Sequence, residues 1–288
     1  MTIAVSIQTN TAAIFAADSR LTTSAFVGFD DAGEPQFVNQ TYENATKIVQ
    51  DTQGFAMAVI AGSATLGPVG VLDYIASSAV PRASATGDQE ALIKGYADGM
   101  AKLRADYWKE KKVAEDRWPH TVALVALAPT QSLSPQVWYI ELRTEQPRVV
   151  LVKRSVYLDG AYDSAASLLY GFRTDVIDAL GKELKVGDQP VGEDAIYQIL
   201  RSVKVLSPID KRSTSVMPIQ DAVELAVFLA TVQIQMERFL PGEPYCGGPI
   251  DVMVLKTAPN PGIIWLPGKT LHHPLTAGKL AIEGGSRP

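Results

Sequence analysis

The stretch TIAVSIQTNTAAIFAADSR, residues 2–20, decides how the chain begins to fold. From Ile3 to Gln8, large apolar residues alternate with small or polar ones, which is the period of a strand. A second apolar run covers 12–17, and the polar residues 9–11 between the two runs favour a turn. The chain is therefore expected to open with a β-hairpin.

The same stretch has no charge before Asp18, so it has to be distinguished from a targeting or membrane segment. It has no basic residues at its start, and polar residues 8–11 interrupt its apolar run, which argues against a signal peptide and a membrane span. The interpretation is a cytoplasmic protein with no membrane partner, in which these residues belong to the fold.

Length and composition narrow the class of protein. The chain has 288 residues, 47% of them hydrophobic and 20% charged, as expected of a folded, enzyme-sized domain. Its net charge of −5 provides no basic surface for a nucleic acid. A single cysteine, Cys246, excludes an internal disulfide and a cysteine-based zinc cluster, and three histidines argue against a multi-histidine metal site. No metal or cofactor is expected.

Beyond residue 20 the pattern predicts groups of strands that alternate with groups of helices. The expected strands are 47–50, 54–61, 122–128, 136–142, 148–153 and 250–255. The expected helices are 66–75, 88–112, 162–182, 193–206 and 218–239. Such grouping is typical of α+β proteins, with packed sheets covered by helices. Residues 1–256 are expected to form one domain and 257–288, rich in proline and glycine, an irregular tail; the role of residues 29–43 stays open.

Thr2 becomes the first residue if the initiator methionine is removed, as is normal when the next residue is small. The mature chain then carries a hydroxyl and a free α-amine on one residue. Because this amine has a pKa of about 7.7–8.0, it can act as the base for its own hydroxyl. Threonine is common at position 2, so this feature gains weight only from its surroundings.

Five segments occur in the order and spacing found in proteasome β-subunits, including bacterial relatives that form simple rings. They are Thr2–Val5, Ala16–Arg20, Lys47–Val49, Ile60–Ala64 and Tyr245–Asp251. The chain resembles this family from Thr2 to about Leu255. It starts directly on the first strand, as β-type subunits do, without the N-terminal helix of α-subunits.

The resemblance implies the Ntn-hydrolase fold, a four-layer αββα sandwich of two antiparallel sheets. It also implies a threonine endopeptidase that assembles into a homo-oligomeric ring and cleaves peptides or unfolded proteins. Whether an ATPase partner exists stays open.

Four residues match the family's catalytic positions. The resemblance makes Thr2 the nucleophile, Lys47 the cation that favours deprotonation of its hydroxyl, and Asp18 the acid that pairs with this lysine. The backbone N–H of Gly62 would face the oxyanion. The structural alternatives are a turn acid at Asp18, a solvated strand-end lysine at Lys47 and a turn glycine at Gly62.

Three auxiliary positions depart from the family pattern. Asp159 falls where the family has a serine, Glu243 replaces an aspartate, and Cys246 replaces a second serine. An ionised Asp159 would accept hydrogen bonds from the Thr2 ammonium, raise the pKa of the amine and shift the working pH upward. Cys246 is expected to be a buried structural thiol, because no histidine lies close in sequence to activate it.

Apolar residues also match the positions that line the family's pocket for the residue before the scissile bond. They are Leu21, Ala45, Val49, Ile60 and Ala64. A charged side chain would be desolvated there without a partner, so apolar substrate residues are expected. The alternative is that all five are ordinary core residues.

Two other functions stay open on the sequence. A catalytically silent structural ring subunit would follow if Met1 is retained. A small-molecule amidase of the wider Ntn-hydrolase class is the other alternative.

Overall fold

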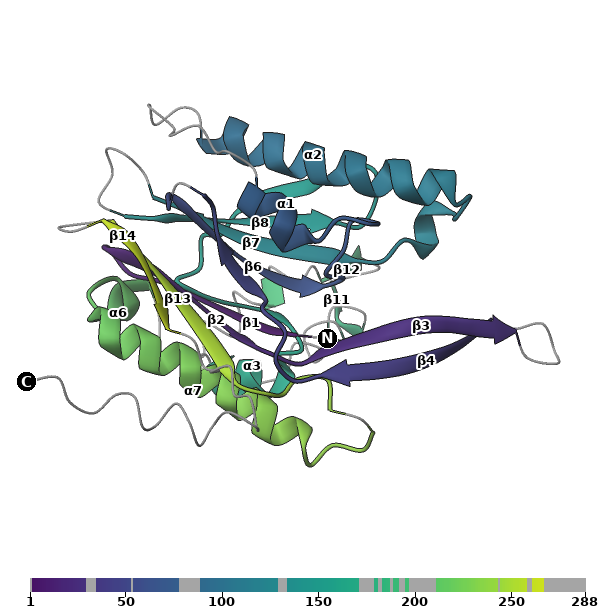
Figure 1. Ribbon diagram of the computed structural model, residues 1–288. Helices are drawn as coiled ribbons and strands as arrows, with labels where there is room; N and C mark the ends of the chain where they lie inside the picture. Colours follow the sequence, from purple (N-terminus) through teal and green to yellow (C-terminus); the bar gives the residue numbers. More distant parts are fainter. Residues whose placement is uncertain are drawn as a thin grey trace, which may run out of the picture.

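The computed structural model shows an α+β protein built on antiparallel sheets (Figure 1). The structure describes residues 2–29, 35–52, 54–77, 89–128, 134–170, 179–180, 183–186, 189–191, 195–196, 211–242, 244–257 and 261–266.

The first five-stranded sheet has the order β10-β1-β2-β13-β14, with every neighbouring pair antiparallel. Its strands are β1 (Ile3–Gln8), β2 (Ala12–Asp18), β10 (Val156–Gly160), β13 (Ile250–Lys256) and β14 (Gly262–Leu266). The N-terminal hairpin expected from the sequence is confirmed. Thr9 closes its turn, because the hydroxyl oxygen accepts the N–H of Ala12 at 2.9 Å and of Thr11 at 3.2 Å.

The second five-stranded sheet follows the chain, in the order β5-β6-β7-β8-β9. Its strands are β5 (Ile48–Gln50), β6 (Ala56–Gly62), β7 (Thr121–Leu127), β8 (Gln136–Leu142) and β9 (Arg148–Leu151). Asp51 closes the turn before β6 by accepting the N–H groups of Phe55 and Ala56 at 2.8 and 3.0 Å. All five strands lie close to their expected positions.

The described helices are α1 (Val71–Ser77), α2 (Gln89–Glu110), α3 (Asp163–Tyr170), α6 (Lys211–Ser215) and α7 (Ile219–Glu237), with a 3-10 turn at Glu115–Arg117. The helices expected at 88–112 and 218–239 are confirmed as α2 and α7. The first expected helix begins late, at residue 71, because Leu66 and Val69 hydrogen-bond across a tight turn that contains Pro68. Most of the helix expected at 193–206 lies outside the described residues.

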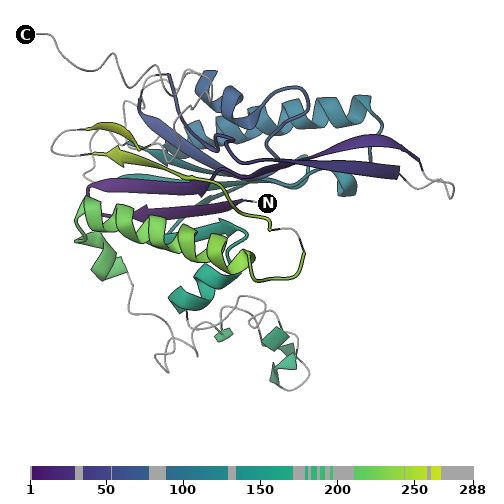
Figure 2. The ribbon, with the colours of Figure 1, turned by 60° about the horizontal axis from the view of Figure 1, so that its bottom comes forward.

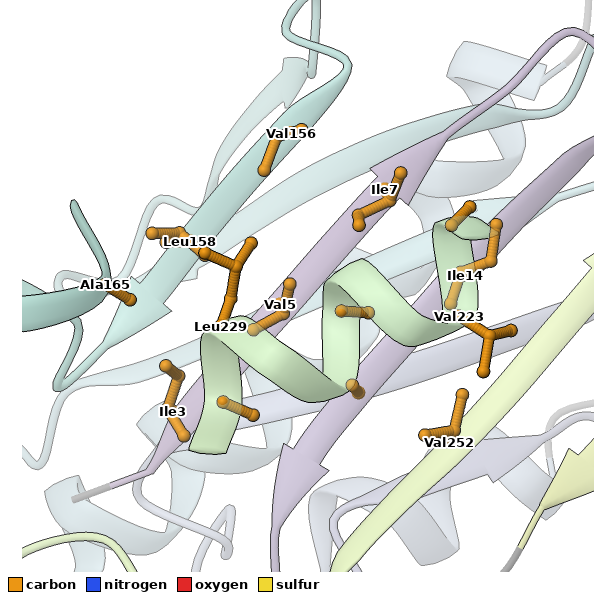
Figure 3. Close-up of a cluster of buried hydrophobic side chains, with 14 of the residues drawn as sticks. Ile3, Val5, Ile7, Ile14, Val156, Leu158, Ala165, Val223, Leu229 and Val252 are labelled. Carbon is orange, nitrogen blue, oxygen red and sulfur yellow. The ribbon is translucent and has the colours of Figure 1, made fainter. Parts of the chain in front are cut away.

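Three hydrophobic clusters bury both faces of each sheet. In one cluster α3 and α7 cover the first sheet, where Val5 packs near Leu229 (Figure 3). In another, α1 and α2 cover the second sheet around Ile60. The third cluster includes Phe15 from the first sheet and Leu124 from the second. The helices therefore lie on opposite outer sides of the paired sheets (Figure 2).

This packing explains the alternation in β1. Ile3, Val5 and Ile7 belong to the cluster with α7, whereas Ala4 belongs to the cluster shared with the second sheet. Successive side chains of a strand point to opposite faces. A small side chain on the inner face allows the two sheets to approach closely.

Several strands were not expected from the sequence. β3 (Leu21–Phe29) and β4 (Pro35–Tyr42) form an antiparallel ribbon that extends beyond the two sheets (Figure 1). β10 and β14 complete the first sheet, and β14 lies within the stretch expected to be an irregular tail. The described residues also include the short pair β11 (Lys185–Val186) and β12 (Gln189–Pro190). Within the described ranges, no helix has the length and apolar character needed to cross a bilayer.

Candidate functional site

The carboxylate of Asp18, at the end of β2, collects hydrogen bonds from four segments of the chain. Its Oδ1 accepts the N–H of Ile3 at 3.1 Å and the Lys47 Nζ at 2.9 Å. Its Oδ2 accepts the N–H of Arg20 at 3.2 Å and of Gly247 at 3.0 Å. Asp18 is 1% exposed, so these donors take the place of water. The residue after Thr2, the lysine and the late glycine are thereby held at one point.

Lys47 and Asp18 form a buried ion pair. Their side chains are only 4% and 0% exposed. Burial raises the pKa of the Asp18 carboxyl, and Lys47 and the N–H groups of Gly247 and Ile3 act in the opposite direction. All four contacts are donated to the carboxylate and favour its ionised form. The expected contact between the two side chains is confirmed, and the alternative of a solvated Lys47 is wrong.

Thr2 lies at the head of β1 and is 4% exposed. Its carbonyl oxygen accepts the N–H of Ala161 at 2.8 Å, just beyond the end of β10. Gly160, opposite Ile3 in the register, has φ +80°, and a Cβ at this position would overlap the Thr2 carbonyl oxygen. The same Cβ would lie 3.5 Å from the Cβ of Ala61. Gly160 therefore allows the chain segments around Thr2 and the end of β6 to meet.

Gly62 ends β6 with φ +79° and is exposed. A side chain here would overlap the carbonyl oxygen of His120, which accepts the N–H of Ser63 at 2.8 Å. Two residues earlier, the N–H of Ile60 donates to the carbonyl of Lys47 at 3.1 Å. The turn role of Gly62 is confirmed, and its role toward an oxyanion stays a prediction. The contacts bring Thr2, Lys47 and Gly62 into one region.

The hydrogen bonds of Asp159 are made within β10. Its Oδ1 accepts the N–H of Gly160 at 2.7 Å and its Oδ2 accepts the Tyr157 hydroxyl at 3.4 Å. In the register Asp159 pairs with Ala4. Burial raises the pKa of Asp159, whereas the Gly160 N–H acts to lower it. Among the described residues neither oxygen hydrogen-bonds to Thr2, and a contact of Asp159 with the free Thr2 amine of the processed chain stays a prediction.

Cys246 is 1% exposed, and its sulfur lies 3.9 Å from the carbonyl oxygen of Ala161. Burial raises the pKa of this thiol, and the negative charges of Asp18 and Glu237 act in the same direction. The thiolate is the reactive form of cysteine. These contacts agree with the expected structural thiol. Glu243, the other late candidate, lies outside the described residues.

The loop at 244–249 is fixed by residues that sequence reasoning did not assign to the site. The Ser19 hydroxyl donates to the carbonyl of Pro249 at 2.6 Å. Arg20 donates through Nη1 to the carbonyl of Pro244 at 3.0 Å and through Nε to Glu43 at 2.9 Å. The contacts with Pro249 and Pro244 join residues more than 200 positions apart. Sequence spacing carries no signal for them.

Another missed residue, Glu237 on α7, supports the same loop. It is 5% exposed, accepts the N–H of Tyr245 at 2.8 Å and accepts the side-chain amide of Gln233 at 3.0 Å. The sequence did contain a signal for this residue, because Glu237 is a charged residue at a position of the helix that faces the core.

The five expected pocket residues fall into two groups. Val49, Ile60 and Ala64 belong to the cluster beneath α1 and α2, and Ile60 is 4% exposed. Leu21 and Ala45 lie near the end of β2, where the N–H of Ala45 donates to the carbonyl of Ser19 at 2.9 Å. The core interpretation holds for Ile60, and the role of the five residues toward a substrate stays a prediction.

Among the described residues, no group of three or more histidine, cysteine, aspartate or glutamate side chains is arranged to hold a metal ion. Neither the protein-family models nor the curated proteins compared with the chain give a match. The interpretation of the site therefore depends on its geometry and chemistry.

The Asp18–Lys47 pair generates the first prediction. In Asp18→Asn the amide nitrogen faces N–H donors and the Lys47 charge loses its partner, so the free energy of unfolding should fall by about 3–5 kcal/mol. Adding Lys47→Met removes the unpaired charge and should recover part of the loss. Urea denaturation of both single variants and the double variant measures this coupling. If the loss of unfolding free energy in the double variant equals the sum of the losses in the two single variants, the coupling between Asp18 and Lys47 is contradicted.

Gly160 generates the second prediction. Gly160→Ala should lower the melting temperature, because the added methyl group overlaps the Thr2 carbonyl and the backbone is left-handed. Gly95→Ala, in the middle of α2, is the matched control, since a Cβ there meets nothing within 4 Å. This control should be about 0.5–1 kcal/mol more stable than the wild type. Equal melting temperatures for Gly160→Ala and the wild type would contradict the close approach.

Asp159 generates the third prediction. Because its pKa is raised on folding, the folded state retains the proton over a range in which the unfolded state has lost it. This group therefore makes the protein less stable as the pH rises from its unfolded pKa of 3.8 through the higher folded value. Asp159→Asn should gain stability relative to the wild type across that range. Denaturation from pH 3.5 to 7 measures the difference, and a stability difference independent of pH would contradict the assignment.

Proposed function

We propose that this chain is a threonine endopeptidase of the Ntn-hydrolase class, similar to proteasome β-subunits, with Thr2 as its nucleophile after removal of Met1. One observation carries the proposal. The Asp18 carboxylate binds both the N–H of the residue after Thr2 and the Lys47 ammonium. A buried cation is thereby attached to the head of β1, as a threonine nucleophile requires.

The fold proposed is the four-layer αββα sandwich of this class. Its support is the set of three hydrophobic clusters, which bury both faces of two antiparallel five-stranded sheets. The proposal also includes a cytoplasmic location and a homo-oligomeric ring.

The proposed reaction uses the side chain and the amine of one residue. The proton of the Thr2 hydroxyl passes through a bound water to the free α-amine, while the charge of Lys47 favours the alkoxide. The Thr2 Oγ1 attacks the substrate carbonyl, and the Gly62 N–H donates to the oxyanion that forms. The C–N bond then breaks, and the leaving amine takes the proton from the α-ammonium. Water hydrolyses the ester and restores the hydroxyl.

Peptides with an apolar residue before the scissile bond are the proposed substrates. The support is the apolar character of Val49 and Ala64, which are partly buried beside β6. A charged substrate side chain would lose its hydration there without gaining a partner.

The fourth prediction tests the nucleophile. A peptide β-lactone should modify the protein at Thr2, as located by peptide mapping, and Thr2→Ala should abolish both labelling and cleavage of an apolar fluorogenic peptide. Lys47→Met should slow cleavage by about 10²–10³. Lys94→Met is its matched control and should leave the rate unchanged, because the side chains of the Lys94–Glu90 pair on α2 are 58% and 60% exposed.

Folded protein must be confirmed by circular dichroism for each variant, since Lys47 belongs to a buried ion pair. Labelling at another residue, or cleavage by Thr2→Ala at the wild-type rate, would contradict the proposal. Labelling of Thr2 without peptide cleavage, together with hydrolysis of small amides, would instead indicate the amidase.

A further inference from the structure

The turn at Gly62 depends on its neighbours for its orientation. Its φ of +79° is left-handed, and glycine adopts positive and negative φ values about equally readily. Two residues earlier, the N–H of Ile60 donates to the carbonyl of Lys47, on the β5 side of β6. N–H groups two residues apart in a strand point the same way, so the Gly62 N–H is directed to this side as well.

The backbone of His120 holds the turn from the opposite side of β6. β7 lies between β6 and β8, and its first residue, Thr121, pairs with Gly62 (Figure 1). The carbonyl oxygen of His120, directly before β7, accepts the N–H of Ser63 at 2.8 Å and fills the space of a Cβ on Gly62. The orientation of the Gly62 backbone therefore depends on where this carbonyl lies.

His120 is joined to β8 through its side chain. The register between β7 and β8 ends at Thr121 and Leu142, one residue short of His120. The Nε2 of His120 lies 3.1 Å from Oε1 of Glu141, and because a carboxylate only accepts hydrogen bonds, Nε2 is the donor. Glu141 pairs with Val122, and residues two apart in a strand share a face, which explains why the ring and the carboxylate meet.

The other contacts of this corner leave a specific task for the pair. Arg104 binds the carbonyl of Pro119 at 2.9 Å, which holds the residue before His120 from the α2 side. Arg148 lies 3.4 Å from Glu141, but its side chain is 70% exposed, so this ion pair contributes little. The Glu141 side chain is 15% exposed, and a hydrogen bond to a partly desolvated carboxylate is stronger than one in water.

We propose that His120 and Glu141 are positioning residues for the oxyanion. Their contact fixes the His120 carbonyl, and this carbonyl keeps the Gly62 backbone in the orientation that directs its N–H at the oxyanion. The inference rests on the proposed function, and neither side chain touches the substrate in it. The pair therefore acts on the transition state through Gly62 and leaves substrate binding unchanged.

Kinetics per labelled active site test the inference. His120→Ala and Glu141→Ala should each lower kcat about tenfold with KM unchanged, a smaller loss than the roughly 10²–10³ for an oxyanion donor removed outright. The double variant should be no slower than either single variant, because both break one contact. Rates are divided by the amount of Thr2 that a peptide β-lactone labels, so that a loss of folded protein does not count.

Two further measurements separate positioning from a general structural role. The affinity for a peptide aldehyde, whose hemiacetal oxygen takes the place of the oxyanion, should fall by the same factor as kcat. His120→Gln should recover most of the rate, because its side-chain amide can donate to Glu141 as Nε2 does. Arg148→Met is the matched control, since it removes the exposed partner of Glu141 and should leave kcat unchanged.

Hydrogen exchange of a peptide covering residues 61–65 tests the contact in a protein of any activity. Protection of the Ser63 N–H should be lost in His120→Ala and Glu141→Ala and kept in Arg148→Met. Unchanged protection, or a kcat per labelled Thr2 equal to that of the wild type in both alanine variants, would overturn the inference. A wild type that is neither labelled nor active contradicts the proposed function, and the exchange result then still decides whether this contact holds the turn.

Discussion

The buried carboxylate of Asp18 is the interaction on which the arrangement of the site depends. A carboxylate removed from water is costly unless its lone pairs are used, and here four donors use them. The donors come from the head of β1, the end of β2, Lys47 and the late loop at Gly247. Satisfying one desolvated group therefore requires four segments of the chain to meet.

This requirement also determines the electrostatics around Thr2. Lys47 is 3% exposed, and its ammonium is held by a partner that is itself held by backbone N–H groups. The backbone of Thr2–Ile3 is held from two sides, by Asp18 through Ile3 and by Ala161 through the Thr2 carbonyl. A charge fixed in a region that excludes water acts more strongly on a neighbouring group than the same charge in solvent. In the proposed reaction, this buried cation near the head of β1 favours deprotonation of the Thr2 hydroxyl.

The strands and helices that could be predicted from the sequence are those with a clear hydrophobic periodicity over a few consecutive residues. Alternation in residues 3–8 and the polar turn after them predicted the β1–β2 hairpin, and helical spacing predicted α2 and α7. β10 was missed because its apolar run, 156–158, is followed directly by Asp159 and Gly160, and β14 was missed because prolines precede it. Because β10 was not predicted, the contact between Tyr157 and Asp159 was not predicted either. Residues two positions apart in a strand lie on the same face. The Asp18–Lys47 contact was expected from resemblance, whereas the Gly247 contact spans 229 residues and has no local signal.

The state of the N-terminus tests the central claim most directly, because the free amine of Thr2 is the base in the proposed reaction. Intact-mass spectrometry of purified protein that cleaves an apolar peptide should give the mass of a chain beginning at Thr2. A sample that retains Met1 on every molecule and still cleaves the peptide would contradict the account.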